Sequence, residues 1–209
     1  MPALLRALGA ISVLLTAVAG CTNNAGSAGT SPSASAAASG AAGSAAVSAA
    51  IPFAAPAIGT RFVTPTGYFQ ITLVNQLTIG TVNNANRSAS WYAGFFYVAN
   101  QVDPRAVEAI WPLQVGKTVT FEERAGADAW RHTVNVVRVE DLPTPAGVFS
   151  TVVVDERIQS LTAAQGNLDV TKTYWYAPSL RWILKRDFVQ KSGPPYASDR
   201  FTVTQVVQP

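Results

Sequence analysis

An alternation of apolar and polar side chains with a period of two is the pattern that most constrains the fold of this chain. In Trp130–Val136, residues 130, 132, 134 and 136 fall on one face, and Phe201 and Val203 alternate with polar neighbours. Such alternation is typical of antiparallel strands that bury one face. Helical periodicity is nearly absent, and Gly, Pro and Asn separate short runs rich in Val, Thr and aromatic residues. The sequence therefore predicts a mainly β domain.

About ten strands are expected in this domain. They cover residues 60–64, 68–74, 78–82, 89–98, 118–124, 130–140, 151–160, 168–176, 182–191 and 200–207. One short helix is predicted over Pro104–Ile110, because Asp103 suits the N-cap and Pro104 the first helical position. Ten strands in a flat open sheet would leave two long edges. We therefore expect a single, strongly curved antiparallel sheet or half-barrel, with a sandwich or a partial barrel as related arrangements.

The N-terminal residues 1–20 read as a signal peptide. The apolar run 7–19 is shorter than the about 20 residues that a membrane-spanning helix needs, and small residues precede Cys21. The tetrapeptide Val18-Ala19-Gly20-Cys21 resembles the lipobox of bacterial lipoproteins. The resemblance implies cleavage between Gly20 and Cys21 and attachment of diacylglycerol to the Cys21 sulfur. An ordinary cleaved signal with a chance cysteine is the alternative.

A lipid on Cys21 would hold the protein at a membrane, outside the cytoplasm, in the bacterial cell envelope. The next residue is Thr22, not the aspartate that signals inner-membrane retention in many lipoproteins. In a cell with two membranes, the resemblance therefore favours the outer membrane, facing the periplasm. No cysteine follows Cys21, so no disulfide can form within the mature chain.

Residues 21–50 contain the lipidated cysteine and a linker made mostly of Ala, Ser and Gly, without a charged side chain. Such a segment has little to bury and is expected to be a flexible spacer with a span of roughly 30 Å. Residues 51–209 then form one domain, which is long enough to bury a sizeable core without disulfides.

Three local patterns in the second half of the chain point to a family. They are Ile110–Lys117, Thr144–Phe149 and Thr173–Leu180, which contain the short sequences PLQVGK, PAGVF and YWYAP. Together they resemble uncharacterised exported bacterial β-domains that are similar to the half-barrels of lipoprotein carriers. The resemblance implies a curved sheet that wraps a hydrophobic cavity around a helix. It implies no catalytic residues.

Several kinds of chemistry find no support in the sequence. The chain has 15 Lys and Arg against 12 Asp and Glu, without a dense basic cluster, so no nucleic-acid partner is expected. His132 is the only histidine, and without a free thiol it cannot build the usual zinc site. Neighbours on a strand point to opposite faces, so neither Glu122–Glu123 nor Asp155–Glu156 forms one chelating pair. We expect no metal, no cofactor and no enzyme activity, with a hydrolase that uses His132 as a less favoured alternative.

Aromatic side chains carry the main functional signal. A hydrophobic or amphiphilic ligand in the concave face of the sheet would contact Trp91, Phe95, Tyr97, Trp130, His132, Tyr174, Tyr176 and Trp182. Arg181, Lys185 and Arg186 could lie at the rim of such a groove and meet an anionic head group. The alternatives are that the aromatic residues form a two-layer core, and that the domain binds an envelope protein or the cell wall without a small ligand.

Overall fold

The computed structural model describes residues 49–97, 101–163, 166–196 and 200–209. The lipobox, Cys21 and most of the predicted linker therefore lie outside the described residues, and their assignments stay predictions. The described part contains no helix that is both long and apolar enough to cross a membrane.

The described domain contains thirteen strands and one helix. They are β1 (Arg61–Thr64), β2 (Gly67–Asn75), β3 (Thr78–Asn83), β4 (Ser88–Tyr92), β5 (Phe96–Tyr97), β6 (Gln101–Val102), α1 (Pro104–Glu108), β7 (Thr118–Ala125), β8 (Asp128–Thr144), β9 (Gly147–Ser160), β10 (Asp169–Ala177), β11 (Trp182–Ser192), β12 (Phe201–Thr202) and β13 (Gln205–Val207). The mainly antiparallel β class with one short helix is confirmed.

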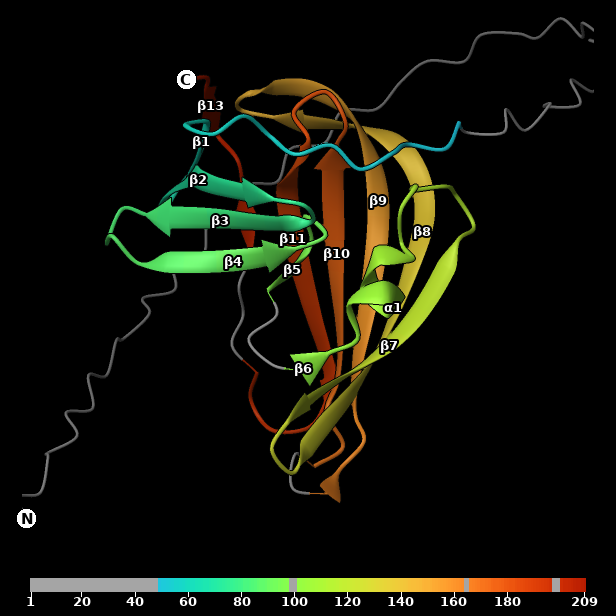
Figure 1. Ribbon diagram of the computed structural model, residues 1–209. Coiled ribbons are helices and arrows are strands. Elements are labelled where there is room, and N and C mark those ends of the chain that lie inside the picture. The colour runs from blue at the N-terminus through green and yellow to red at the C-terminus, as the bar shows by residue number, and fades with distance from the viewer. Residues whose placement is uncertain (1–48, 98–100, 164–165, 197–199) are drawn as a thin grey trace, which may run out of the picture. The chain divides into compact units, whose positions relative to one another are not determined.

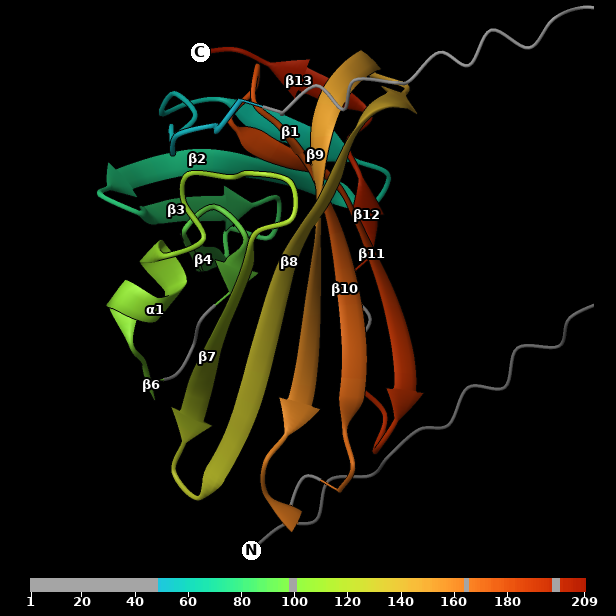
Figure 2. The same cartoon turned by 90° about the vertical axis from the view of Figure 1, so that its right-hand side faces the viewer.

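The strands form two antiparallel sheets. The smaller has the order β13-β1-β2-β3-β4-β5, and the larger has the order β12-β11-β10-β9-β8-β7-β6. Figure 1 shows the long strands β7 to β11 beside the shorter strands β2 to β4, with α1 in front of the larger sheet. In Figure 2, the smaller sheet lies against the upper part of the larger one.

The strands are thus shared between two sheets, whereas the sequence pattern predicted a single curved one. The expected strand 89–98 is interrupted because Ala93 and Gly94 adopt positive φ angles, which separate β4 from β5. The expected strand 200–207 is divided because the chain changes sheets within it. The amide of Val203 donates to Leu184 of β11 (2.7 Å), and the next amide, of Thr204, donates to Val63 of β1 (2.7 Å). The very short strand β6 was not predicted.

Two apolar clusters hold the sheets together. One lies where the sheets meet and contains Phe62, Ile71 and Ile79 of the smaller sheet with Trp182 and Leu184 of β11. The other covers the inner face of the larger sheet. It contains Phe95, Phe96, Val107, Ile110, Leu113, Phe121, Val134, Val136, Val152, Val154, Tyr174, Tyr176 and Ile183. This second cluster brings α1 and the β4–β5 segment onto the sheet that carries the candidate site.

Helix α1 begins as the sequence predicts. The side chain of Asp103 accepts a hydrogen bond from the backbone amide of Arg105 (3.0 Å), and Pro104 occupies the first turn. The side chain of Val107 is fully buried against the larger sheet. A five-residue helix gains little from its own hydrogen bonds, so this packing is what maintains it.

Candidate functional site

The inner face of the larger sheet carries a group of ionisable side chains beside its aromatic core. Glu123 of β7, His132 of β8, Glu156 of β9 and Tyr174 of β10 come from four neighbouring strands. His132 pairs with Ile158 and Val134 pairs with Glu156, so His132 and Glu156 lie two residue pairs apart along the β8–β9 ladder and on the same face. We call these four residues the histidine cluster.

His132 is held on both sides of its ring. Its Nδ1 lies 2.7 Å from Oε1 of Glu156, and its Nε2 lies 3.1 Å from Oε2 of Glu123. Both carboxylates are acceptors, so both ring nitrogens donate and the ring is an imidazolium. The ring also stacks on Phe121, with centroids 4.6 Å apart and planes 10° from parallel. The cation is thereby fixed in position as well as in charge.

The charge state of His132 follows from this environment. Burial lowers the pKa of the imidazole, but the hydrogen bonds and negative charges of Glu123 and Glu156 outweigh burial and raise it to about 9. Burial likewise raises the pKa of Glu156, but the hydrogen bond and charge of His132, with the charge of Lys172, lower it overall. His132 is therefore a cation and Glu156 a carboxylate at neutral pH.

A small cavity lies beside the histidine cluster. Its walls include Phe96, Ile158, Lys172 and Tyr196 as well as the cluster itself, and its volume is about 30 Å³. The hydroxyl of Tyr174 donates to Oε2 of Glu156 (2.5 Å), so the second carboxylate oxygen of Glu156 is also bonded. This volume suits one or two water molecules and is too small for an acyl chain.

His132 is not a general base in this arrangement, because neither of its ring nitrogens has a free lone pair at neutral pH. A hydrolase that uses His132 would first have to break one of its two contacts with a carboxylate. No group of three or more His, Cys, Asp or Glu side chains in the described part of the chain is arranged to hold a metal ion.

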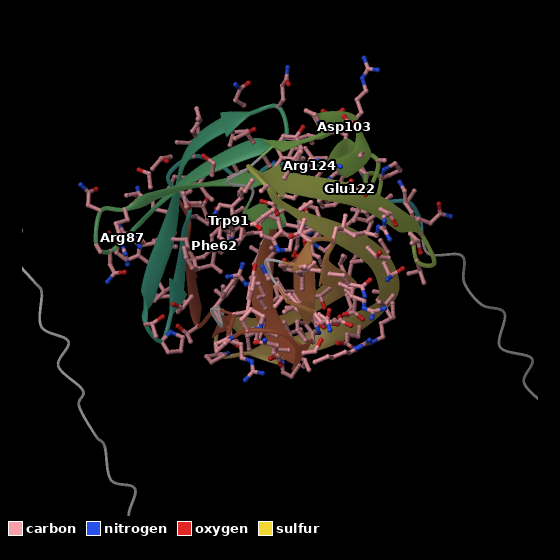
Figure 3. The ribbon with its side chains drawn as sticks, turned by 90° about the horizontal axis from the view of Figure 1, so that it is seen from below. Phe62, Arg87, Trp91, Asp103, Glu122 and Arg124 are labelled. Atoms are coloured by element: carbon pink, nitrogen blue, oxygen red, sulfur yellow. The ribbon has the colours of Figure 1, made fainter. Side chains whose placement is uncertain are left out.

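The residues predicted to contact a ligand are divided among several packing clusters. Trp91 and Trp182 lie between the sheets, with ring centroids 5.6 Å apart, and Trp182 also stacks on Phe62. Figure 3 shows Phe62 and Trp91 in the interior of the domain. Phe95 packs on Tyr174 and Tyr176, with centroid distances of 5.8 and 5.4 Å.

The other predicted contacts lie elsewhere. Trp130 is half-buried and packs with a third cluster that contains Ile158 and Phe188. Tyr97 belongs to β5, but its side chain is outside the described residues. Most of the residues predicted to contact a ligand thus pack on one another, and their role in binding stays a prediction.

Three inward-facing charged residues were not predicted from the sequence. Glu123, Glu156 and Lys172 were not proposed as site residues, although Glu123 and Glu156 belong to the two acidic pairs that were considered. In each pair one carboxylate faces out, as expected from strand geometry: Glu122 meets Arg124 (3.0 Å), and Asp155 accepts from Thr173 (2.7 Å). To place these residues on the same face as His132, one needs the register between neighbouring strands, and the sequence does not give it.

The three basic residues predicted at the rim of a groove do not share one site. Arg181 donates to the backbone carbonyl of Ala55 (3.3 Å), whereas Lys185 and Arg186 both line an open pocket at the β11–β12 edge. The ammonium group of Lys185 lies 4.3 Å from the centroid of the Trp175 ring.

No protein-family model matches the chain, and no curated protein matches its sequence. Three solved structures are similar to it. A "putative exported protein with YmcC-like fold" from Bacteroides fragilis has 14% identity and a TM-score of 0.39, over 77% of this chain and 100% of that one. The hypothetical lipoprotein YmcC from Escherichia coli has 10% identity and a TM-score of 0.41, over 66% and 84%.

The third is a "putative lipoprotein" from Parabacteroides distasonis, with 11% identity and a TM-score of 0.37, over 76% of this chain and 100% of that one. At these TM-scores the likeness assigns neither a family nor a function to this chain.

Proposed function

We propose that this protein is a lipid-anchored lipoprotein of the bacterial cell envelope whose β-domain acts by binding and not by catalysis. The observation that supports a binding role most directly is the closed histidine cluster. Its only imidazole donates from both nitrogens to Glu123 and Glu156, so it does not present a base to a substrate. The lipobox at Val18–Cys21 supports the anchor, and Thr22 favours the outer membrane in a cell with two membranes.

Lipid attachment has a direct test. The full chain is produced in bacteria fed a radiolabelled or alkyne-bearing fatty acid, beside the variants Cys21→Ser and Thr22→Ser. We expect label and membrane association in the wild type and in Thr22→Ser, and loss of both in Cys21→Ser, because only the Cys21 sulfur can take the diacylglycerol. Label that persists in Cys21→Ser would contradict the proposed anchor.

In the first version of the proposal, the bound molecule is a hydrophobic or amphiphilic ligand. The aromatic inner face supports it, but the described cavity beside His132 holds about 30 Å³. An acyl chain could enter there only if the cavity widened. Mass spectrometry of small molecules extracted from the purified full chain tests this version. A stoichiometric amphiphile supports it, and a chain that copurifies with none contradicts it.

The second version is a module that binds an envelope protein or the cell wall. It is favoured by two exposed apolar side chains on the long β8–β9 hairpin, Val139 (45% exposed) and Val148 (70% exposed). In crosslinked envelopes, Val148→Ser should reduce capture of a specific partner. The matched control is Val189→Ser, on the exposed side of β11 (55% exposed). Equal capture by the wild type and both variants would count against this surface.

A further inference from the structure

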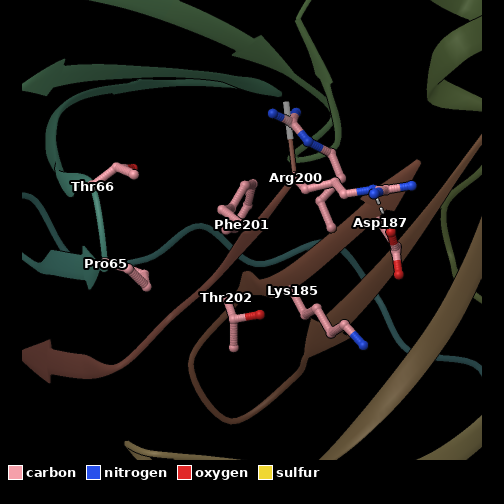
Figure 4. Close-up of a pocket in the computed structure, with 8 residues that line it drawn as sticks. Pro65, Thr66, Lys185, Asp187, Arg200, Phe201 and Thr202 are labelled. Atoms are coloured by element: carbon pink, nitrogen blue, oxygen red, sulfur yellow. Dashed lines mark ion pairs between the residues drawn. The ribbon is translucent and has the colours of Figure 1, made fainter. Parts of the chain in front are cut away.

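An open pocket of about 350 Å³ lies at the edge where β11 meets the short strand β12. Pro65 and Thr66, from the β1–β2 turn, form one side, and Arg186, Asp187, Arg200 and Phe201 form the other. Figure 4 shows Pro65 and Thr66 across from Phe201, with Arg200 paired to Asp187. The pocket is separate from the histidine cluster and shares no lining residue with it.

The side chain of Arg186 is held in place at this pocket before any ligand binds. Its side chain is 6% exposed, and its guanidinium carbon lies 5.2 Å from the centroid of Trp91 and 5.0 Å from that of Phe201. Contact with two aromatic rings restricts the guanidinium and reduces the entropy lost when an anion binds.

Arg200 supplies a second guanidinium. Its Nε lies 2.8 Å from Oδ1 of Asp187, and the same side chain donates to the backbone carbonyl of Phe188. A guanidinium has five N–H donors, so these contacts leave it further donors for a ligand. Among the described residues that line the pocket, Asp187 is acidic and Lys185, Arg186 and Arg200 are basic.

We propose that this pocket binds a phosphate-bearing ligand, with the phosphate oxygens on the guanidiniums of Arg186 and Arg200. Guanidinium groups match phosphate in charge and geometry, and a phosphate can accept from two of them at once. The volume lies at the lower end of the range for small-molecule sites. The phosphate therefore belongs to a small organic group, whose apolar part lies on Pro65 and Phe201.

The phosphate can come from a lipid head group or from a soluble phosphate ester. The inference names a ligand class for the binding role proposed above and rests on it. Its failure would not affect the anchor, because lipid labelling at Cys21 is measured separately.

The test is titration calorimetry on the full chain in a nonionic detergent. The probes are glycerol phosphate, glycerate as its carboxylate counterpart, and micelles doped with phosphatidylglycerol or with phosphatidylcholine. The variants are Arg200→Gln, Asp187→Asn and the control Arg87→Gln, whose side chain is exposed in the β3–β4 turn.

Arg200→Gln should weaken binding roughly tenfold or more, as expected for loss of a charge-assisted hydrogen bond. Asp187→Asn should tighten binding several-fold, because it removes the negative charge next to the phosphate. Arg87→Gln should bind as the wild type does. Opposite effects at positions 187 and 200 cannot come from partial unfolding, which weakens binding in both variants.

Saturable binding of glycerol phosphate with this variant pattern supports a soluble ester. The same pattern with phosphatidylglycerol micelles alone supports a lipid head group. Equal affinity for glycerate, absence of saturable binding to every probe, or indifference to both pocket substitutions would overturn the proposal.

Discussion

Nδ1 of His132 lies 2.7 Å from Oε1 of Glu156, and both residues are almost fully buried, at 5% and 2% exposure. A charged pair in a protein interior must have its remaining polar atoms bonded, because desolvation otherwise outweighs the attraction. Here Glu123 takes the second ring nitrogen and Tyr174 the second carboxylate oxygen. The pair therefore fixes how β7, β8, β9 and β10 align on the inner face.

Removal of the imidazole should be costly for folding. His132→Ala leaves Glu123 and Glu156 facing each other without the cation between them. We expect the free energy of unfolding to fall by roughly 3–5 kcal/mol, as when one partner of a buried pair is removed. Urea denaturation followed by tryptophan fluorescence measures it. Glu122→Gln, at the outward-facing neighbour of Glu123, should change it by no more than about 0.5 kcal/mol, and equal losses in the two variants would contradict the role of the cluster.

The same pair predicts a pH dependence of stability. The pKa of His132 is about 9 in the folded protein against an ordinary 6.5, so the folded state binds this proton more tightly than the unfolded chain. Its contribution is therefore full below about pH 6.5 and is lost as the pH rises towards 9, by roughly 3 kcal/mol in all.

Urea midpoints measured between pH 6 and pH 9.5 test this dependence. His132→Gln, which cannot take up the proton, should have a flatter profile over that range. A wild-type profile that is no steeper than that of His132→Gln would show that deprotonation of the imidazolium does not cause the loss of stability. On the acidic side, the lowered pKa of Glu156 predicts a loss of stability as the pH falls below its ordinary value of 4.5.

Trp182 should be the most sensitive aromatic residue between the two sheets. It is fully buried and packs on Phe62 and Trp91, each with a centroid distance of 5.6 Å. Trp182→Ala should lower the free energy of unfolding by roughly 3–5 kcal/mol, because it leaves a cavity in the interface. Trp182→Phe should cost less, since it keeps a ring and removes an indole N–H that has no hydrogen-bond partner among the described residues.

Thermal unfolding of both Trp182 variants measures these losses. Trp130→Ala is the control, because Trp130 is only half-buried and lies outside this interface. A loss at Trp130 as large as that of Trp182→Ala would contradict the assignment of the interface core.

Gly193 should not tolerate a side chain. It has φ +96°, and a Cβ there would lie 2.5 Å from the backbone Cα of Leu168, which cannot move aside as a flexible side chain can. Gly193→Ala should lower the free energy of unfolding by roughly 1–3 kcal/mol. Gly126→Asn is the matched control, since Gly126 has φ +62° with no atom within 4 Å of a Cβ, and asparagine tolerates this conformation. Chemical denaturation distinguishes the two, and a loss at Gly126 as large as that at Gly193 would contradict the close approach.

Much of the local structure could be predicted because it depends on neighbours in the chain. The alternation around His132 places Trp130, His132 and Val134 on one face, and Asp103 with Pro104 starts the helix, as the structure shows. The splitting of residues 200–207 could not be predicted, since Val203 and Thr204 bond to strands that lie far away in sequence. The histidine cluster depends in the same way on the register between separate strands.

By itself, the sequence determined most of the strand-forming segments, the alternation of side chains along a strand, the short capped helix and the lack of a cysteine after Cys21. These follow from backbone geometry and side-chain chemistry over a few residues. The tertiary structure alone decided that the strands divide between two sheets, that Glu123 and Glu156 meet His132, and that Arg186 and Arg200 share one pocket. Those outcomes depend on which distant strands pair and in what register. Pairing and register are set by burial of the apolar surface of the whole domain and not by any local pattern.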